Sequence, residues 1–460
     1  MAISIINLRR TTMFKRKESL VPRMSTVQFI TLMFVVIIFL GAFLLWLPFS
    51  QKPGQTISFI DALFIATSSV CVTGLTPVNV SEVFNSMGHT IMMILIELGG
   101  LGFMSVFLMI AILLKKRVSF QSRLVIKDML NADSHGGIIR LLTFVLKFSL
   151  TVQAVGALLL SFQFIPEYGV KKGVFFSIFH SISAFCNAGF DLFGNSLISY
   201  RDNPYILVII SLLIVAGGFG FIVWYDLIHF KETKRLSLHT RLALIVTGSL
   251  LAIGFIIFYF TDVQKNGSII ARLANSFFLS VTPRTAGFVS IDYGDFSYAG
   301  IMLTIVLMFI GGTSGSTAGG VKTTTIGVLG LQVISLFKGR ESAEGFERTV
   351  PTATVLKSFV LVFFASMLCF VSSLVLSLTE TIPQNSGIEY VLFEVVSAFA
   401  TVGLTMGLTP DLTYFGKILI IFLMFIGRVG LYTVSFSLIN RSRKASIKNI
   451  SYPKENVLVG

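Results

Sequence analysis

The chain has 460 residues, of which 54% are hydrophobic and only 13% are charged, and its mean hydropathy is +0.85. So few charged residues cannot cover so much apolar surface, so the composition excludes a soluble protein and predicts an integral membrane protein that sits in a lipid bilayer. The formal net charge of +14 lies in short basic segments between apolar runs, which indicates cytoplasmic membrane flanks and not a nucleic-acid partner.

Five basic segments divide the chain, and we place all of them in the cytoplasm: residues 9–23, 115–127, 231–241, 338–348 and 441–448. Each stretch between two of these segments must leave and re-enter the cytoplasm, so it holds an even number of crossings. Both termini are then cytoplasmic. The first apolar run has no small-residue cleavage site at its end, so we interpret it as a retained span and not a signal peptide.

Each stretch contains an apolar span, a shorter apolar segment and a second span. The outgoing spans are residues 27–49, 138–164, 241–261 and 355–378, and the returning spans are residues 87–114, 205–229, 299–335 and 415–439. At about 1.5 Å per residue such runs cross or nearly cross a hydrocarbon core of roughly 30 Å, and they do so as helices. The segments between them are too short to cross and are typical of re-entrant half helices: residues 58–72, 173–186, 269–283 and 387–400.

The sequence therefore predicts an all-α integral membrane protein with eight transmembrane helices. It consists of four parallel M1-P-M2 repeats (span, re-entrant pore helix and loop, span) with pseudo-fourfold symmetry around one pore. The expected divisions are a cytoplasmic N-terminus at 1–26, repeats at 27–115, 137–230, 240–337 and 353–440, and a cytoplasmic C-terminus at 441–460. Since each repeat starts and finishes on the same side, an inverted repeat is excluded.

A glycine follows each half helix, preceded by a small or β-branched residue. The pairs are Thr73-Gly74, Ala188-Gly189, Ala286-Gly287 and Val402-Gly403. A helix C-cap explains one such glycine, but four at matching positions favour loops that converge on one axis. Glycine lets a backbone carbonyl turn toward that axis, and rings of carbonyls replace the water shell of a monovalent cation. The half helices also point their partially negative C-terminal ends inward, which favours a cation.

A glycine-rich run interrupts the third returning span: Gly311, Gly312, Thr313, Ser314, Gly315, Ser316, Thr317, Ala318, Gly319 and Gly320. Five glycines in ten residues predict a break in the helix, near mid-membrane and below the four loops. A phosphate-binding loop is disfavoured because Val321 separates Lys322 from the run and no soluble strand precedes it. Close packing of small residues is an alternative, and a mobile gate is the preferred interpretation.

Arg428 lies in an otherwise uncharged span at about the same depth. A charge there is costly and usually functional, although a side chain that snorkels toward the cytoplasm is the alternative. We expect Arg428 to contact residues 311–320 and to add an electrostatic barrier to cations. Asp61 and Glu394 are expected to cap or hydrogen-bond the pore loops, and Glu97 has no evident partner.

The remaining candidates for chemistry are weak. Cys71, Cys186 and Cys369 lie in apolar surroundings without metal-ligand spacing, so we expect buried small side chains and neither a disulfide nor a metal site. His180 is expected to be a hydrogen-bonded packing residue.

The four loops resemble the filter sequences of the Trk/Ktr/HKT superfamily of potassium transporters, and the resemblance covers about residues 27–440. With eight expected spans, the chain is most similar to the KtrB type of bacterial membrane subunit. The resemblance implies that the four loop glycines face the ion, and that the glycine-rich run is a gate with Arg428 below the filter. Sodium-preferring plant relatives often carry serine at the position of Gly74, so the resemblance implies potassium. Each loop has one glycine where the TVGYG of potassium channels has two, which predicts a shorter and less discriminating filter.

The resemblance also implies partners. It implies a homodimer on a ring of cytosolic RCK subunits (KtrA-like), with ATP or ADP bound only by that partner, sodium-dependent uptake, and a place in the bacterial plasma membrane. No covalent cofactor is expected, and residues 339–351 and the C-terminal tail are candidate docking surfaces. The alternatives are a secondary transporter of another solute, which predicts a midplane pocket and inverted repeats, and a membrane enzyme, which needs clustered nucleophiles or metal ligands. The sequence shows none of these features.

Overall fold

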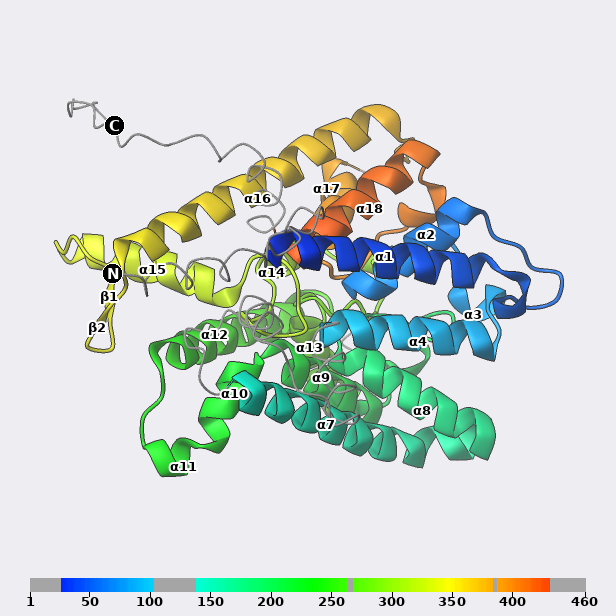
Figure 1. The fold of residues 1–460 in the computed structure, drawn as a ribbon, viewed down its shortest axis with the longest axis horizontal. Helices are drawn as coiled ribbons and strands as arrows, with labels where there is room; N and C mark the ends of the chain where they lie inside the picture. Colours follow the sequence, from blue (N-terminus) through cyan, green and yellow to red (C-terminus); the bar gives the residue numbers. More distant parts are fainter. Residues whose placement is uncertain (1–25, 103–137, 264–267, 384–386, 431–460) are drawn as a thin grey trace, which may run out of the picture.

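The computed structural model describes residues 26–102, 138–263, 268–383 and 387–430 (Figure 1). The basic segments at 9–23, 115–127 and 441–448 lie outside the described residues, and so do the ends of the first and fourth returning spans. The described chain is mostly helical. Its strands are β1, Glu344–Gly345, and β2, Arg348–Thr349, which pair as an antiparallel hairpin.

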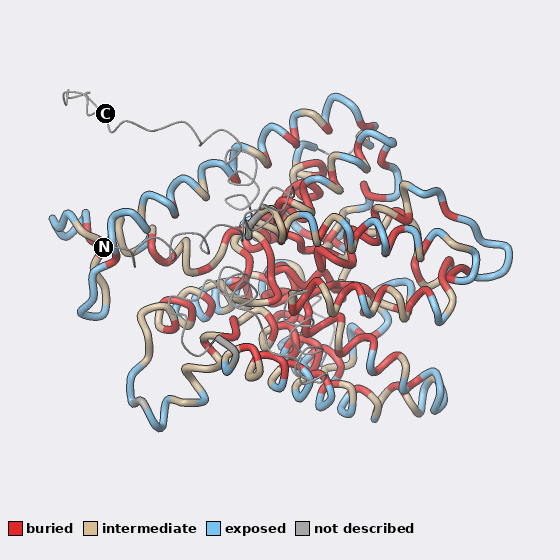
Figure 2. Tube along the Cα trace, in the orientation of Figure 1, coloured by how far each residue is buried: buried red, intermediate tan, exposed pale blue. Residues whose placement is uncertain are grey.

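Long apolar helices occupy the four predicted outgoing spans. They are α1, Thr26–Trp46; α7, Ile138–Tyr168; α12, Leu238–Thr261; and α16, Thr352–Thr379. Each is long and apolar enough to cross a membrane, and most of its side chains are not buried inside the protein. In Figure 2 the exposed residues follow the outer edges of α7 and α16, where lipid can cover them, whereas buried residues fill the middle.

Shorter helices follow each long one and form the interior. They are α2, Phe59–Cys71; α8, Val170–Phe185; α13, Ile269–Val281; and α17, Ile388–Phe399. Serine side chains start two of them, because the hydroxyls of Ser58 and Ser268 accept hydrogen bonds from backbone N–H groups of the first turn. Each short helix packs against the long helix before it.

A third set of helices follows the short ones: α4, Ser86–Gly100; α9, Pro204–Gly218; α14, Tyr298–Phe309; and α18, Tyr414–Val429. Each contacts the short helix of the next stretch of chain: α4 contacts α8, α9 contacts α13, and α14 contacts α17. The last, α18, contacts α2 near the start of the described chain. These contacts run in a closed circle and bring the ends of all four short helices to the middle.

Two helices of this third set continue after a break. The helix α10, Phe221–Ile228, follows α9 at an angle of 95°, so the prediction of one continuous helix over residues 205–229 is wrong. The physical reason is Gly220, whose φ of +91° is incompatible with a helix. The helix α15, Thr323–Phe337, follows α14 after a non-helical segment that holds the glycine-rich run.

Among the described residues, four helices pass the length and hydropathy criteria for a membrane span, or five if α9 and α10 form one span. The remaining short elements are η1, Pro48–Ser50; α3, Val80–Val83; η2, Ile198–Tyr200; α11, Phe230–Thr233; η3, Tyr293–Asp295; and η4, Thr409–Asp411.

Candidate functional site

Each of the four short helices ends in the same backbone turn. The residue two positions before each loop glycine has a positive φ, and so has the glycine itself. The φ values are +59° and +97° for Val72 and Gly74, +58° and +69° for Asn187 and Gly189, +74° and +79° for Thr285 and Gly287, and +53° and +95° for Thr401 and Gly403. Positive φ is uncommon outside glycine, so this repeated pair defines one loop conformation that occurs four times.

The first two loop glycines lie directly against their neighbours in the next loop. A Cβ atom added to Gly74 would lie 2.6 Å from the carbonyl oxygen of Ala188. One added to Gly189 would lie 2.8 Å from the carbonyl oxygen of Ala286. At each step, therefore, a glycine faces the carbonyl that precedes the next glycine.

The other two loop glycines continue the same arrangement and close it. A Cβ atom on Gly287 would collide with the carbonyl oxygen of Val402, and one on Gly403 would collide with that of Thr73. The structure thus brings the four glycines and the four preceding residues together in one ring of backbone. The ring has no space for a side chain at any of the four positions.

Serine hydroxyls support the first and fourth loops from behind. The Ser68 Oγ accepts a hydrogen bond from the Gly74 N–H at 2.9 Å, and the Ser397 Oγ accepts one from the Gly403 N–H at 3.1 Å. These bonds fix the peptide plane whose carbonyl belongs to Thr73 or Val402. Both serines are buried.

Behind the second and third loops the corresponding hydroxyls are hydrogen-bond donors and not acceptors. The Ser183 Oγ donates to the Phe190 carbonyl at 2.8 Å, and the Thr282 Oγ1 donates to the Phe288 carbonyl at 2.6 Å. The sequence interpretation missed all four hydroxyl residues. The signal that identifies them is a serine or threonine five or six positions before each loop glycine.

Glycines of the third helix set pack against the ends of the short helices. A Cβ atom would collide with a carbonyl oxygen at three of them: Gly99 with Val70, Gly217 with Phe185, and Gly427 with Phe399. Each of these carbonyls precedes a loop glycine by four positions. The third helix set therefore approaches the first, second and fourth loops as closely as backbone allows.

The glycine-rich segment, residues 311–320, lies beside the loops. The Thr313 N–H donates to the Gly218 carbonyl at 3.0 Å, and the Thr317 N–H donates to the Gly217 carbonyl at 3.2 Å. A Cβ atom on Gly319 would lie 2.9 Å from the Ala400 carbonyl oxygen. The segment thus touches the end of α9 on one side and the fourth loop on the other.

Arg428 contacts this segment, as the sequence predicted. Its guanidinium donates to the Thr317 carbonyl, and also to the carbonyls of Gly99 and Gly100, the latter at 3.0 Å. The charge is therefore held among carbonyl groups inside the protein and does not snorkel outward. Lys322 holds the same segment, because its Nζ donates to the Ala318 carbonyl at 2.5 Å.

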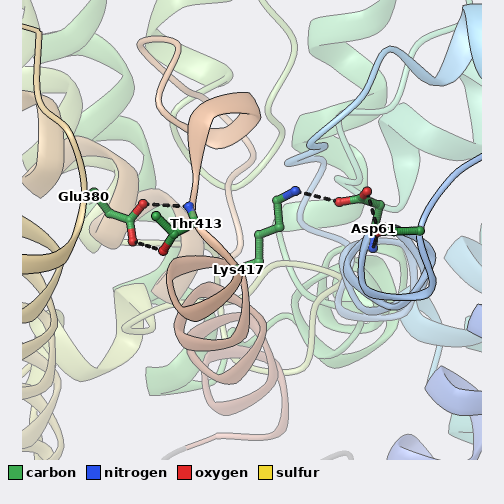
Figure 3. Close-up of polar contacts among 5 residues, drawn as sticks. Asp61, Glu380, Thr413 and Lys417 are labelled. Carbon is green, nitrogen blue, oxygen red and sulfur yellow. Dashed lines mark hydrogen bonds and ion pairs between the residues drawn. The ribbon is translucent and has the colours of Figure 1, made fainter.

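An ion pair joins the first and last stretches of the described chain (Figure 3). Lys417 Nζ at the start of α18 lies 2.8 Å from Asp61 Oδ1 in α2, and the Ser58 hydroxyl donates to Asp61 Oδ2 at 2.6 Å. Beside it, Glu380 at the end of α16 accepts bonds from the N–H and the hydroxyl of Thr413 at 2.7 and 2.6 Å. Both carboxylate oxygens of Asp61 therefore have partners within the protein.

Two other acidic residues also have protein partners. Glu394 is buried and accepts hydrogen bonds from the hydroxyls of Thr405, at 2.7 Å, and Thr409. It therefore holds the chain that follows the fourth loop, which agrees with the expected structural role. Glu97 Oε2 accepts a hydrogen bond from Gln153 Nε2 at 2.9 Å and contacts the Cys186 thiol at 3.3 Å, so Gln153 and Cys186 are its partners.

The cysteines and His180 are packing residues. Cys71, Cys186 and Cys369 are free and buried, and His180 Nδ1 lies 2.7 Å from the Phe176 carbonyl. Within the described ranges, no group of three or more His, Cys, Asp or Glu side chains could hold a metal ion.

Asp191 lies in the loop after Gly189. Burial raises the pKa of its carboxyl group above the ordinary value, although the backbone N–H groups that donate hydrogen bonds to it act in the opposite direction.

Known proteins are similar to this chain in sequence and in fold. A family model described as TrkH, cation transport protein, matches residues 2–447. The chain is 52% identical over 448 residues to the potassium/sodium uptake protein NtpJ of Enterococcus hirae, which covers 96% of this chain and 99% of that protein. It is 39% identical over 443 residues to the Ktr system potassium uptake protein B of Bacillus subtilis, with 95% and 97% covered. The crystal structure of the potassium transporter TrkH from Vibrio parahaemolyticus has the same fold, with a TM-score of 0.72 at 20% identity over 92% of this chain and 86% of that one.

Proposed function

The chain belongs to the TrkH family of cation transport proteins, and we propose that it takes up potassium through the ring formed by its four loops. Its relatives are ion transporters and not enzymes. The observation that carries the proposal is the closed ring in which each loop glycine faces the carbonyl oxygen of the neighbouring loop. A dehydrated cation needs such oxygens to replace its water shell.

In this proposal the ion-binding residues are the eight of the ring: Gly74, Gly189, Gly287, Gly403, Thr73, Ala188, Ala286 and Val402. The four short helices support this assignment, because their C-terminal ends and partial negative charges meet at the ring. The hydroxyl of Ser68 and its three counterparts orient the loops from behind. The transported ion is potassium, and because the ring is short it excludes sodium only in part.

The gate is the glycine-rich segment together with Arg428. This assignment is supported by the contacts of residues 311–320 with α9 and with the fourth loop, and by the hydrogen bond from Arg428 to the Thr317 carbonyl. A guanidinium below the ring repels cations while the segment is in place. Opening requires the segment to move away from the axis.

The described helix order also supports the proposed topology. A long helix, a short helix, a loop and a further helix recur four times, which fits four parallel M1-P-M2 repeats with pseudo-fourfold symmetry and eight spans. The two ends of the chain are then cytoplasmic, and the protein is a multi-pass protein of the bacterial plasma membrane. The alternative is a secondary transporter of another solute, which would need a midplane pocket and inverted repeats.

The assembly in the proposal is a homodimer with a regulatory partner. The Bacillus subtilis relative is named as part of a Ktr system, which supports a KtrA-like cytosolic RCK ring that binds ATP or ADP. The Enterococcus hirae relative is named for potassium and sodium, which supports sodium-dependent uptake.

Growth at low potassium tests the proposal. Expression of the chain in a bacterial strain that lacks its own potassium uptake systems restores growth at micromolar external potassium. Protein that is present in the membrane but restores no growth, alone or with a KtrA-like subunit, contradicts it.

A further inference from the structure

Arg284 is a buried cation to which the proposed function assigns no role. It lies in the third loop, three positions before Gly287, and only 7% of the residue is exposed. Its Nη2 donates to the Gly311 carbonyl and to the Thr247 hydroxyl, both at 3.3 Å, and its Nε has no partner. In the part of the chain that the structure describes, no carboxylate forms an ion pair with it. A buried charge without an anionic partner is costly.

Three helix ends stabilise this guanidinium. The helix α9 ends at Gly218, α13 ends at Val281, and α14 ends at Phe309. A cavity of about 10 Å³ lies beside the guanidinium, lined in part by Gly218, Thr247, Val281, Arg284 and Gly312. The C-terminal ends of helices carry partial negative charge. The positive charge of Arg284 is therefore balanced by helix ends and the Gly311 carbonyl in place of a carboxylate.

The contact with Gly311 links two parts of the proposed pore. Gly311 is the first residue of the glycine-rich segment, and Arg284 belongs to the third filter loop. Toward the other end of the segment, Arg428 on α18 holds the Thr317 carbonyl. Two arginines from different parts of the chain thus hold the two ends of one segment.

We infer that Arg284 is a positioning residue that pins the start of the glycine-rich segment to the third filter loop. The segment then opens by release at Thr317, while Gly311 stays fixed beside the filter. This inference rests on the proposed role of residues 311–320 as the gate. It predicts that loss of Arg284 loosens the segment without unfolding the rest of the protein.

Hydrogen–deuterium exchange of the purified full chain tests the inference. Peptides that cover residues 311–323 report on the N–H groups of Thr313 and Thr317, which bond to the end of α9. In Arg284→Gln these peptides exchange about tenfold faster than in the wild type, because a hydrogen bond from a charged donor is lost. Peptides from α1, α7 and α16 keep their wild-type rates.

Arg272→Gln is the matched control. Arg272 lies in α13, the helix that precedes Arg284. Its guanidinium is 4.7 Å from the Tyr259 ring centre, and its Nε also has no hydrogen-bond partner. This variant leaves exchange in residues 311–323 unchanged. Unchanged exchange in Arg284→Gln, equal acceleration in both variants, or equal acceleration throughout the chain overturns the inference.

Arg284→Lys replaces the glutamine variant if that protein does not fold. It keeps the charge but loses the planar fork of donors, so a smaller acceleration confined to residues 311–323 is expected, and none contradicts the inference. Exchange does not depend on transport. If the wild type transports no potassium, the proposed function is wrong. If residues 311–323 exchange as slowly in the Arg284 variants as in the wild type, only the role of Arg284 is wrong.

Discussion

Lys417 and Asp61 form an ion pair that closes the circle of helices, with 2.8 Å between Nζ and Oδ1 and only 16% and 15% of the side chains exposed. The two residues belong to α18 and α2, at opposite ends of the described chain. A pair that is partly shielded from water contributes more than an exposed one. Its position indicates that it holds the fourth stretch of chain against the first.

The first prediction concerns this pair. Lys417→Met removes the cation and leaves the Asp61 carboxylate partly buried without an opposite charge, which costs about 2 kcal/mol of stability. We expect the thermal unfolding midpoint of the purified protein to fall by several degrees. Arg340→Met is the control, because its pair with Glu344 lies in the exposed segment between α15 and β1 and is worth little. Equal unfolding midpoints for both variants would show that the ion pair between Lys417 and Asp61 does not hold α18 against α2.

The second prediction concerns the ring. Gly287→Ser places a side chain against the Val402 carbonyl oxygen at a φ of +79°, so the ring widens or distorts and its ratio of potassium to sodium flux falls by about tenfold or more. Gly54→Ser is the matched control, since Gly54 has a φ of +81° with no neighbour within 4 Å. The control carries the same backbone strain and keeps wild-type selectivity. An unchanged flux ratio in Gly287→Ser argues against the filter assignment.

The third prediction concerns the hydroxyls behind the loops. Ser68→Ala removes the acceptor of the Gly74 N–H, and an unsatisfied buried N–H costs about 1–3 kcal/mol. Selectivity for potassium over sodium is expected to fall about threefold or more, because the peptide plane is no longer fixed. The adjacent Ser69 is buried but its hydroxyl has no partner, so Ser69→Ala should leave selectivity intact. If both alanine variants behave alike, the hydroxyl bonds do not orient the filter.

The fourth prediction concerns the gate. Deletion of residues 313–318 removes the part of the segment that contacts α9 and Arg428, so potassium flux rises. The ends of the segment tolerate the deletion because the Gly311 N–H donates to the Val321 carbonyl and the Val321 N–H to that of Phe309. Arg428→Gln, which removes the charge and the guanidinium donor to the Thr317 carbonyl, should also raise flux. Lower flux through intact, folded protein would contradict the gate.

The sequence predicted the helices well where hydropathy changes sharply. The four short helices fall within a few residues of the expected half helices, because charged or turn-forming residues flank each short apolar run. The break between α9 and α10 was missed because residues 206–224 are continuously apolar. The glycines at 217, 218 and 220 indicate this break, and glycines with the same spacing occur at 99, 100 and 102.

Long-range contacts could not be predicted from one sequence. Nothing near Asp61 in the chain points to Lys417, and Arg284 sits in a loop where a charge looks solvent-exposed. Arg428 was easier, because a lone charge in a long apolar helix is conspicuous and its depth matches that of the glycine-rich segment. Local pattern identified the loop residues, whereas their assembly into one ring depends on packing among all four stretches.

Potassium flux into proteoliposomes that contain only the purified chain tests the central claim most directly. With an inward potassium gradient and an equal concentration of competing sodium, we predict potassium entry well above that of empty liposomes and faster than sodium entry. No potassium entry, or equal entry of both ions, through folded and correctly inserted protein would contradict a potassium filter at the ring of four glycines.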